Sequence, residues 1–303
     1  MPTQAIDFHP PADDAAPFLL PLPATLFADR ADRFAALAAG HSLGDWLAFL
    51  GQLSRAQHEI YRGLPVLPLP DATSLEQART HGMPPLNASS LRRPAAWRFA
   101  LQQLILRLDI DAPEGAKASL KRLFTASDAE LERLAEMLLS GEPDAEQADL
   151  LPFVGAALQI VFTGLASQLD VRQLHPLDAH GVCPCCGSLP VASVVRLGAT
   201  INNLRYLHCS LCNTEWNLAR ATCTTCATDQ GVALHELEGS KGAVRAETCD
   251  TCKSYLKIVY QEKDPQADPV ADDLATLALD MLVDEAGYTR AGPNLLLVGA
   301  YGS

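Results

Sequence analysis

The stretch Cys183-Pro-Cys-Cys-Gly187, together with Cys209-Ser-Leu-Cys212, Cys223-Thr-Thr-Cys226 and Cys249-Asp-Thr-Cys252, decides the fold of this chain. All nine cysteines of the 303-residue sequence lie between Cys183 and Cys252. Eight of them form four Cys-x-x-Cys pairs, and the last two pairs repeat the first two at a fixed offset of 40 residues, from 183 to 223 and from 209 to 249. This register indicates a duplicated unit.

Each unit carries the ligands of a tetrahedral sulfur site. Two Cys-x-x-Cys turns joined by a hairpin enclose one ion in zinc ribbons and in rubredoxin-type iron sites. We predict two mononuclear metal sites, one formed by Cys183, Cys186, Cys209 and Cys212 and the other by Cys223, Cys226, Cys249 and Cys252. Ligation within each unit is favoured, because a duplicated unit should close its own site. The alternative combines the first pair with the third and the second with the fourth.

Cys185 has no counterpart, because position 225 is threonine. We interpret Cys185 as a bystander thiol, since a tetrahedral site already has four ligands; a ligand-exchange or redox role is the alternative. A closed Cys₄ site has no open coordination position, which disfavours hydrolytic metal chemistry. Glycine-rich phosphate loops and a His-Glu-x-x-His motif are also missing from the sequence, so we expect no enzymatic activity.

The N-terminal half predicts helices. Residues 1–25 hold six prolines and predict an extended arm, whereas residues 26–175 predict an all-α domain of six or seven helices. The start signals are Ser42 with Asp45, Ser74 with Gln77, Ser127 with Glu130 before Gly141, and Pro94 at a first helical position. The apolar run from residue 150 to 166 is short for a membrane span, so we expect a buried core helix and no membrane insertion.

After residue 176 the pattern changes. Alternating runs at 191–197 and 232–238 predict β-hairpins in a first module of residues 181–221 and a second module of residues 222–263. Residues 268–286 return to helical spacing with Gly287 as a stop, so residues 268–303 predict one helix and a tail packed on one of the domains. The predicted class is therefore α+β: a helical domain, two tandem rubredoxin-like or zinc-ribbon Cys₄ modules, and a C-terminal helix.

Charge and targeting signals restrict the partners and the compartment. The chain has 36 acidic residues against 23 Lys and Arg, a net charge of −13 that repels phosphate backbones, so we expect no nucleic-acid partner. The first 24 residues lack Lys and Arg and are interrupted by prolines, unlike a secretory signal. We expect a cytoplasmic protein, where thiols stay reduced and paired cysteines bind metals more often than they form disulfides.

Three stretches of the C-terminal half carry a family likeness. They are Arg205-Tyr-Leu-His-Cys-Ser-Leu-Cys-Asn-Thr-Glu-Trp216, Glu247-Thr-Cys-Asp-Thr-Cys-Lys-Ser-Tyr-Leu-Lys257 and Asp272-Asp-Leu-Ala-Thr-Leu-Ala-Leu-Asp280. With Gly287-Tyr-Thr-Arg-Ala-Gly-Pro-Asn294 they resemble the FdhE family of formate dehydrogenase accessory proteins. The likeness is close from about residue 181 onward and loose in the helical half, where Gly82-Met-Pro-Pro-Leu86 matches best.

The resemblance implies a cytoplasmic accessory protein that is not an enzyme. It would bind the catalytic subunit of a respiratory, molybdenum-dependent formate dehydrogenase and be required for that enzyme to become active. The resemblance also implies rubredoxin-like iron on the eight paired cysteines. Gly187 fits the rubredoxin knuckle, but Asn213, Ala227 and Lys253 replace its glycine, so zinc remains an alternative to iron. Two other functions remain open: a one-electron redox protein acting on the client cofactor, and a structural zinc-ribbon scaffold for protein interactions.

Overall fold

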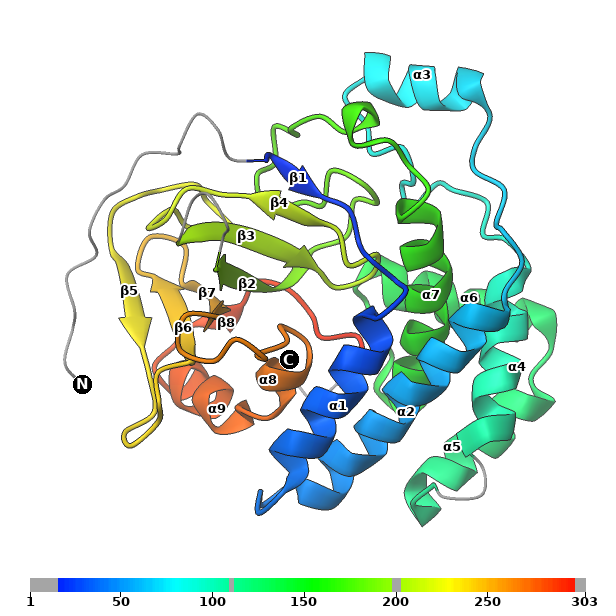
Figure 1. The fold of residues 1–303 in the computed structure, drawn as a ribbon, viewed down its shortest axis with the longest axis horizontal. Helices are drawn as coiled ribbons and strands as arrows, with labels where there is room; N and C mark the ends of the chain where they lie inside the picture. The colour runs from blue at the N-terminus through cyan, green and yellow to red at the C-terminus, as the bar shows by residue number, and fades with distance from the viewer. Residues whose placement is uncertain (1–15, 109–111, 198–202, 298–303) are drawn as a thin grey trace.

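The N-terminal half of the computed structural model is a layer of helices beside a mixed sheet (Figure 1). The structure describes residues 16–108, 112–197 and 203–297. Its first seven α-helices are α1 Leu26–Ala38, α2 Gly44–Gly63, α3 Ala72–Thr80, α4 Ala96–Leu108, α5 Glu114–Thr125, α6 Asp128–Ser140 and α7 Leu151–Ala166. The all-α N-terminal region predicted from the sequence is therefore found.

Helix α7 is the centre of this layer. Apart from its proline at position 152, all its residues are buried, and it packs against α2, α4 and α6. A helix that is apolar on every side is buried among neighbours on every side. The buried core helix predicted from the apolar run at 150–166 is therefore confirmed. Among the residues described, no helix combines the length and apolarity that crossing a membrane would require.

One of the predicted helix starts is correct and three are shifted. Ser127 and Glu130 form a complete capping box before α6, and Gly141 ends the helix with a left-handed φ of 75°. Helix α3 is capped by Asp71 rather than by Ser74, because the Asp71 carboxylate accepts the Ser74 amide hydrogen bond at 2.8 Å. Helix α2 begins at Gly44 and α4 at Ala96, each two residues after the predicted signal.

The two Cys₄ modules form one continuous sheet. The strands are β1 Phe18–Leu19, β2 Pro190–Arg196, β3 Leu204–Cys209, β4 Glu215–Asn217, β5 Val232–His235, β6 Val244–Cys249, β7 Ser254–Tyr260 and β8 Thr289–Arg290. They lie in the order β1-β4-β3-β2-β7-β6-β5, with β8 beside β7. Each module is an antiparallel three-stranded unit, and a parallel pair of β2 with β7, in register at Ser193 and Ile258, joins them.

The described end of the Pro-rich arm lies on the first module. Phe18 pairs with Trp216 and Leu19 with Glu215, so β1 covers the outer edge of β4. The first module shares the main hydrophobic core with the helices, through Cys183, Leu207 and Leu211 among others. The second module instead packs a small cluster of its own against α9. The two copies of one sequence unit therefore have different surroundings.

The predicted single C-terminal helix is wrong. Residues 268–286 form two helices, α8 Ala271–Leu274 and α9 Leu277–Glu285, and Gly287 ends the second with φ 87°. The break lies beside the buried Lys257 ammonium, which donates to the carbonyl oxygens of Asp273 and Thr276, at 2.7 and 3.1 Å. The same two carbonyls also accept the amides of Thr276 and Leu279, three residues further along the chain, at 3.2 and 2.9 Å, so the chain turns more tightly than an α-helix between α8 and α9. Helix α8 contacts α1, whereas α9 contacts β6, so this segment bridges both halves (Figure 1).

Candidate metal centres

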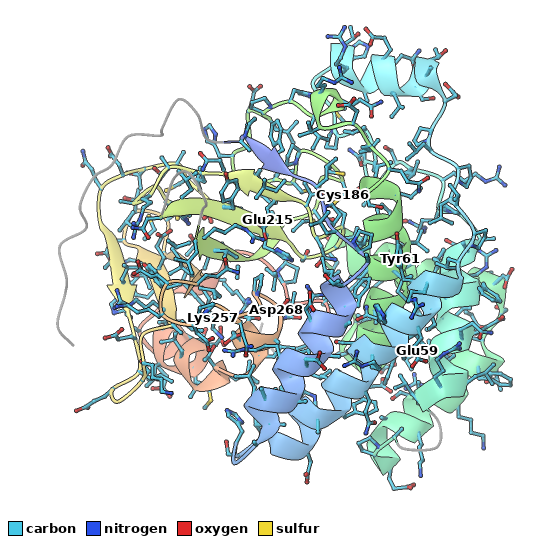
Figure 2. All side chains as sticks on the ribbon, viewed as in Figure 1. Glu59, Tyr61, Cys186, Glu215, Lys257 and Asp268 are labelled. Atoms are coloured by element: carbon cyan, nitrogen blue, oxygen red, sulfur yellow. The ribbon has the colours of Figure 1, made fainter. Side chains whose placement is uncertain are left out.

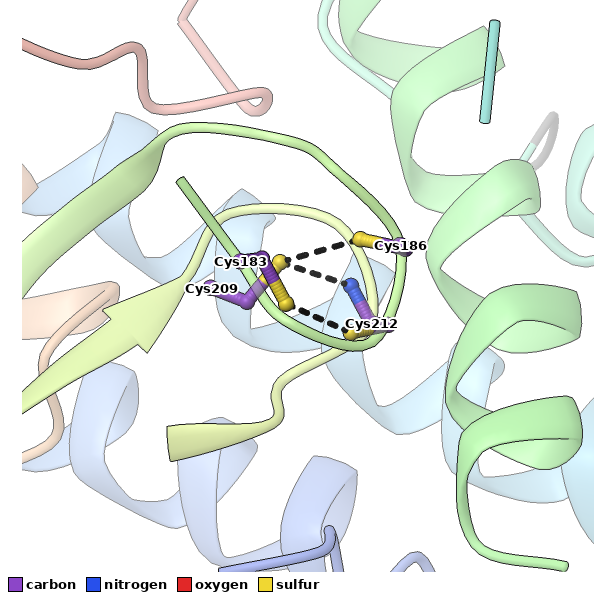
Figure 3. Close-up of side chains that lie close together, drawn as sticks. All are labelled: Cys183, Cys186, Cys209 and Cys212. Atoms are coloured by element: carbon purple, nitrogen blue, oxygen red, sulfur yellow. Dashed lines mark hydrogen bonds between the residues drawn. The ribbon is translucent and has the colours of Figure 1, made fainter. Parts of the chain in front are cut away.

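Four cysteine sulfurs converge at the end of β3 in the first module (Figure 3). Cys183 Sγ lies 3.6 Å from Cys212 Sγ, and Cys186 Sγ lies 3.4 Å from Cys209 Sγ. In the second module the matching pairs are Cys223 with Cys252 at 3.6 Å and Cys226 with Cys249 at 3.7 Å. Within each cluster all four sulfurs lie within 4.8 Å of one another. The cysteines group within each repeat unit as predicted, and the interleaved arrangement is wrong.

The sulfur separations fit a tetrahedral ion. Four sulfurs at about 2.3 Å from a central zinc are about 3.8 Å apart, close to the separations found here. A disulfide would need about 2.05 Å, and all nine cysteines are free. All four donor atoms are sulfurs, which bind zinc or iron, whereas magnesium and calcium bind oxygen ligands.

One backbone hydrogen bond recurs in three of the four knuckles. The amide of the residue after the second cysteine donates to the carbonyl of the first cysteine, from Gly187 to Cys183, from Ala227 to Cys223 and from Lys253 to Cys249, at 2.9 to 3.0 Å. Amides also point at the sulfurs: Leu211 and Cys212 donate to Cys209 Sγ at 3.4 Å. These amides offset negative charge on a thiolate, which a metal ligand requires.

The missing glycines do not change the knuckle geometry. The residue after each second cysteine has a left-handed φ: Gly187 at 80°, Asn213 at 57°, Ala227 at 59° and Lys253 at 55°. Glycine adopts this conformation freely and asparagine tolerates it, whereas alanine and lysine are strained there by about 1–2 kcal/mol. The first module therefore has the two permissive residues and the second module has the two strained ones.

A hydroxyl group contacts the last cysteine of each cluster. Thr214 Oγ1 lies 3.2 Å from Cys212 Sγ, and its counterpart Ser254 Oγ lies 3.0 Å from Cys252 Sγ. Burial raises the pKa of the Cys252 thiol, but hydrogen bonds from Ser254, Cys223 and Cys226 together outweigh burial and bring that pKa to about 7. In the first cluster burial likewise opposes ionisation, yet the neighbouring cysteines bring the pKa of Cys212 well below its ordinary value. In both clusters the cysteine beside the hydroxyl is the one whose pKa is lowered.

The residues around the sites have structural roles that the sequence left undecided. Proximity to Cys212 and burial both raise the pKa of Cys185 well above its ordinary value, so Cys185 stays a protonated thiol beside the first cluster. His208 Nδ1 hydrogen-bonds Glu215 and its Nε2 hydrogen-bonds Asn213, at 2.8 and 3.0 Å. Trp216 is buried and donates its indole N–H to the carbonyl of His180. The predicted metal ligands are the eight paired cysteines alone, and Cys185, His208 and Trp216 are not among them.

Two buried ionic clusters were missed by the sequence analysis. Arg205 of the first module forms a buried ion pair with Glu247 of the second at 2.7 Å. Lys257, which Figure 2 places at the C-terminal helices, is completely buried among Asp273, Asp280 and Arg290. Asp273, Asp280 and Arg290 of this cluster come from residues 272–280 and 287–294, two of the stretches that carry the family resemblance. Asn294 also donates to Asp273 at 2.8 Å. A polar residue at an otherwise apolar strand position is the signal that marks Lys257.

Comparison with known proteins identifies the family. A helical domain followed by two fused Cys₄ ribbons defines the class as a tandem sulfur-site metal-binding protein. Family models named FdhE, N-terminal, FdhE, central domain and FdhE, C-terminal domain match residues 15–179, 182–220 and 221–297. The chain therefore belongs to the FdhE family.

Individual relatives cover nearly the whole chain. A protein FdhE homolog from Edwardsiella ictaluri is 42% identical over 283 residues, which is 93% of this chain and 91% of that protein. A homolog from Pseudomonas aeruginosa is 40% identical over 277 residues, 90% of each chain. The crystal structure of the FdhE protein from Pseudomonas aeruginosa superposes with a TM-score of 0.86 at 38% identity, over 95% of this chain and 100% of that chain. The resemblance noted in the sequence is confirmed.

Proposed function

We propose that this protein is a non-enzymatic, metal-binding accessory factor for the maturation of a respiratory, molybdenum-dependent formate dehydrogenase. The observation that carries the proposal is the pair of Cys₄ clusters whose sulfur separations, 3.4 to 3.7 Å, match a tetrahedral ion in a chain of the FdhE family. Cys183, Cys186, Cys209 and Cys212 would hold one ion, and Cys223, Cys226, Cys249 and Cys252 the other.

The bound ion would fix the knuckles and supply folding free energy to the second module, whose own core is small. We assign iron to both sites, because the family resemblance and the left-handed knuckle geometry at all four positions favour a rubredoxin-like centre. Zinc is compatible with the same four sulfurs. The metal sites would keep the sheet in the shape that contacts the client.

The partner in this proposal is the catalytic subunit of formate dehydrogenase, met in the cytoplasm. A tagged chain expressed in cells that make the enzyme should co-purify with that subunit. The matched control replaces Cys249 and Cys252 with serine, which removes two ligands of the second site, and should recover less of the subunit. If neither protein co-purifies with the subunit in cells that contain active enzyme, the proposal is contradicted.

A one-electron redox role is the second candidate function. One ligand of the second cluster, Cys226, is exposed to solvent, so an ion held there would lie within reach of a redox partner. Zinc has no redox chemistry, which separates this function from the first. If electron transfer is the role, the iron form should cycle reversibly and support client activation, while a zinc-substituted chain should bind the client without activating it.

A further inference from the structure

The two copies of the repeat differ in the access that solvent has to their cysteines. In the first cluster Cys183, Cys186, Cys209 and Cys212 are all 0% exposed. In the second, Cys223 and Cys249 are buried, whereas Cys226 is exposed and Cys252 is partly exposed. The matching knuckle residues follow the same division, because Cys185 and Leu211 are buried and their counterparts Thr225 and Thr251 are exposed.

Other elements fasten the first knuckles in place. The Leu86 amide donates to the Cys185 carbonyl at 2.9 Å and the Ala88 amide donates to the Cys186 carbonyl at 2.8 Å. From α7, Gln159 donates to the Ser210 carbonyl, and Thr163 accepts from Asn213, each at 2.8 Å. The segment around Gly82-Met-Pro-Pro-Leu86 therefore closes the first site against the helical core.

The second knuckles carry backbone strain that the first knuckles avoid. Ala227 has φ 59° and Lys253 has φ 55°, where the first module places Gly187 and Asn213. A Cβ atom disfavours this conformation by about 1–2 kcal/mol per residue. An ion on the second knuckles would be bound with both residues in this strained conformation, so the strain would lower the affinity of the second site and not that of the first.

From exposure and strain together, and building on the metal binding proposed above, we infer that the second cluster is an exchangeable metal site and the first is a permanent one. A competing ligand of the thiol or aminocarboxylate class reaches the ion beside Cys226, the exposed cysteine of the second cluster. Loss of that ion loosens the outer knuckles of the sheet and leaves the core module folded, because the first module is built into the main hydrophobic core.

The test is site-resolved metal release. The full chain is loaded with two zinc ions and exposed to EDTA together with N-ethylmaleimide, while zinc release is followed and the alkylated cysteines are mapped by mass spectrometry. We expect one zinc to leave at least about tenfold faster than the other. Early alkylation should be confined to Cys223, Cys226, Cys249 and Cys252.

A pair of matched variants tests the strain directly. Ala227→Gly combined with Lys253→Gly relieves both strained positions, partly offset by the entropy of glycine in the unfolded chain, and should tighten the second site about tenfold in competition with EDTA. Gly187→Ala introduces the same strain into the first knuckle, where the nearest atom to the new Cβ is 3.5 Å away, and should weaken only the first site. An unchanged second site in the double glycine variant would refute the strain argument.

The outcomes distinguish metal binding by the two clusters from faster metal exchange at the second cluster. Two zinc ions that leave together, or alkylation that begins at Cys183, Cys186, Cys209 or Cys212, would overturn the exchange inference while leaving metal binding intact. A chain that takes up less than about one zinc would overturn the metal binding itself. Loss of one ion with the alkylation confined to the second cluster supports both.

Discussion

At the scale of single residues, the structure explains how a rubredoxin-type knuckle forms without its glycine. Asn213, Ala227 and Lys253 all have a left-handed backbone, and at Ala227 and Lys253 the residue's amide closes the turn by donating to the carbonyl of Cys223 or Cys249. The sequence shows which positions depart from glycine. It cannot show that the departures leave the geometry intact, because this depends on how the four cysteines of each cluster converge from two knuckles that are distant along the chain.

Glu215 is a residue whose charge stabilises the first module. Burial raises its pKa, but the His208 hydrogen bond and the Arg196 guanidinium, 2.5 Å away, outweigh burial and lower it to about 2. The ordinary value is near 4.5, so this carboxylate contributes roughly 3 kcal/mol that is present above pH 4.5 and is lost as the pH falls toward 2.

We therefore expect Glu215→Gln to lower the free energy of unfolding by about 3 kcal/mol at pH 7, with the difference from the natural chain shrinking between pH 4.5 and pH 2. Denaturant titrations at several pH values measure this. Glu236→Gln removes a more exposed carboxylate and serves as the control, with an effect below about 1 kcal/mol. A gap between Glu215→Gln and the natural chain that stays constant down to pH 2 would argue against the ionic role.

At the scale of elements, one buried arginine fastens the two modules together. Arg205 on β3 reaches Glu247 on β6 at 2.7 Å and also donates to the Thr222 carbonyl and the Thr224 hydroxyl. Its counterpart in the repeat, Arg245, pairs with Glu236 near the surface. The two arginines occupy matching positions of the repeat, 40 residues apart, but the pairing of β2 with β7 gives them different surroundings.

Arg205→Met leaves the Glu247 carboxylate buried without its cation, and we expect a loss of about 3–5 kcal/mol in the free energy of unfolding at pH 8. The loss should become smaller toward pH 5, because a protonated Glu247 needs no counter-charge. Arg245→Met is the matched control and should cost about 1 kcal/mol or less. Equal losses for the two variants would show that burial of the pair does not matter.

The tail after β8 comes very close to β2. A Cβ atom at Gly292 would lie 1.9 Å from the carbonyl oxygen of Pro190, so only glycine allows this approach. We expect Gly292→Ala to lower the melting temperature by several degrees, equivalent to a few kcal/mol. Gly115→Ala, in α5 with open space around it, should be neutral or slightly stabilising in the same thermal scan. A melting temperature unchanged by Gly292→Ala would mean that the tail detaches easily.

At the scale of the whole molecule, local signals predicted what local forces determine. The cysteine register predicted both clusters and their grouping, and the apolar run at 150–166 predicted the buried helix α7. Long-range contacts determined the rest. The break between α8 and α9 lies beside the buried Lys257 ammonium, which donates to the carbonyls of Asp273 and Thr276, and the joining of the modules through β2 and β7 depends on edges that no periodicity reveals.

The same long-range packing makes the repeat asymmetric. The first module lies in the helical core and the second at the periphery, although their cysteine spacing is identical. The cysteine spacing therefore predicted two sites, and their different surroundings give their cysteines different access to solvent.

Metal content together with an optical spectrum decides whether each chain holds two metal ions on its eight paired cysteines. Protein purified without oxygen and without added metal, then exposed to air, should contain two ions per chain. Thiolate-to-iron absorption would identify the ions as iron. A colourless protein with two zinc ions would support the same two sites and identify the metal as zinc. Fewer than about one ion per chain, with the cysteines oxidised in pairs, would contradict the account.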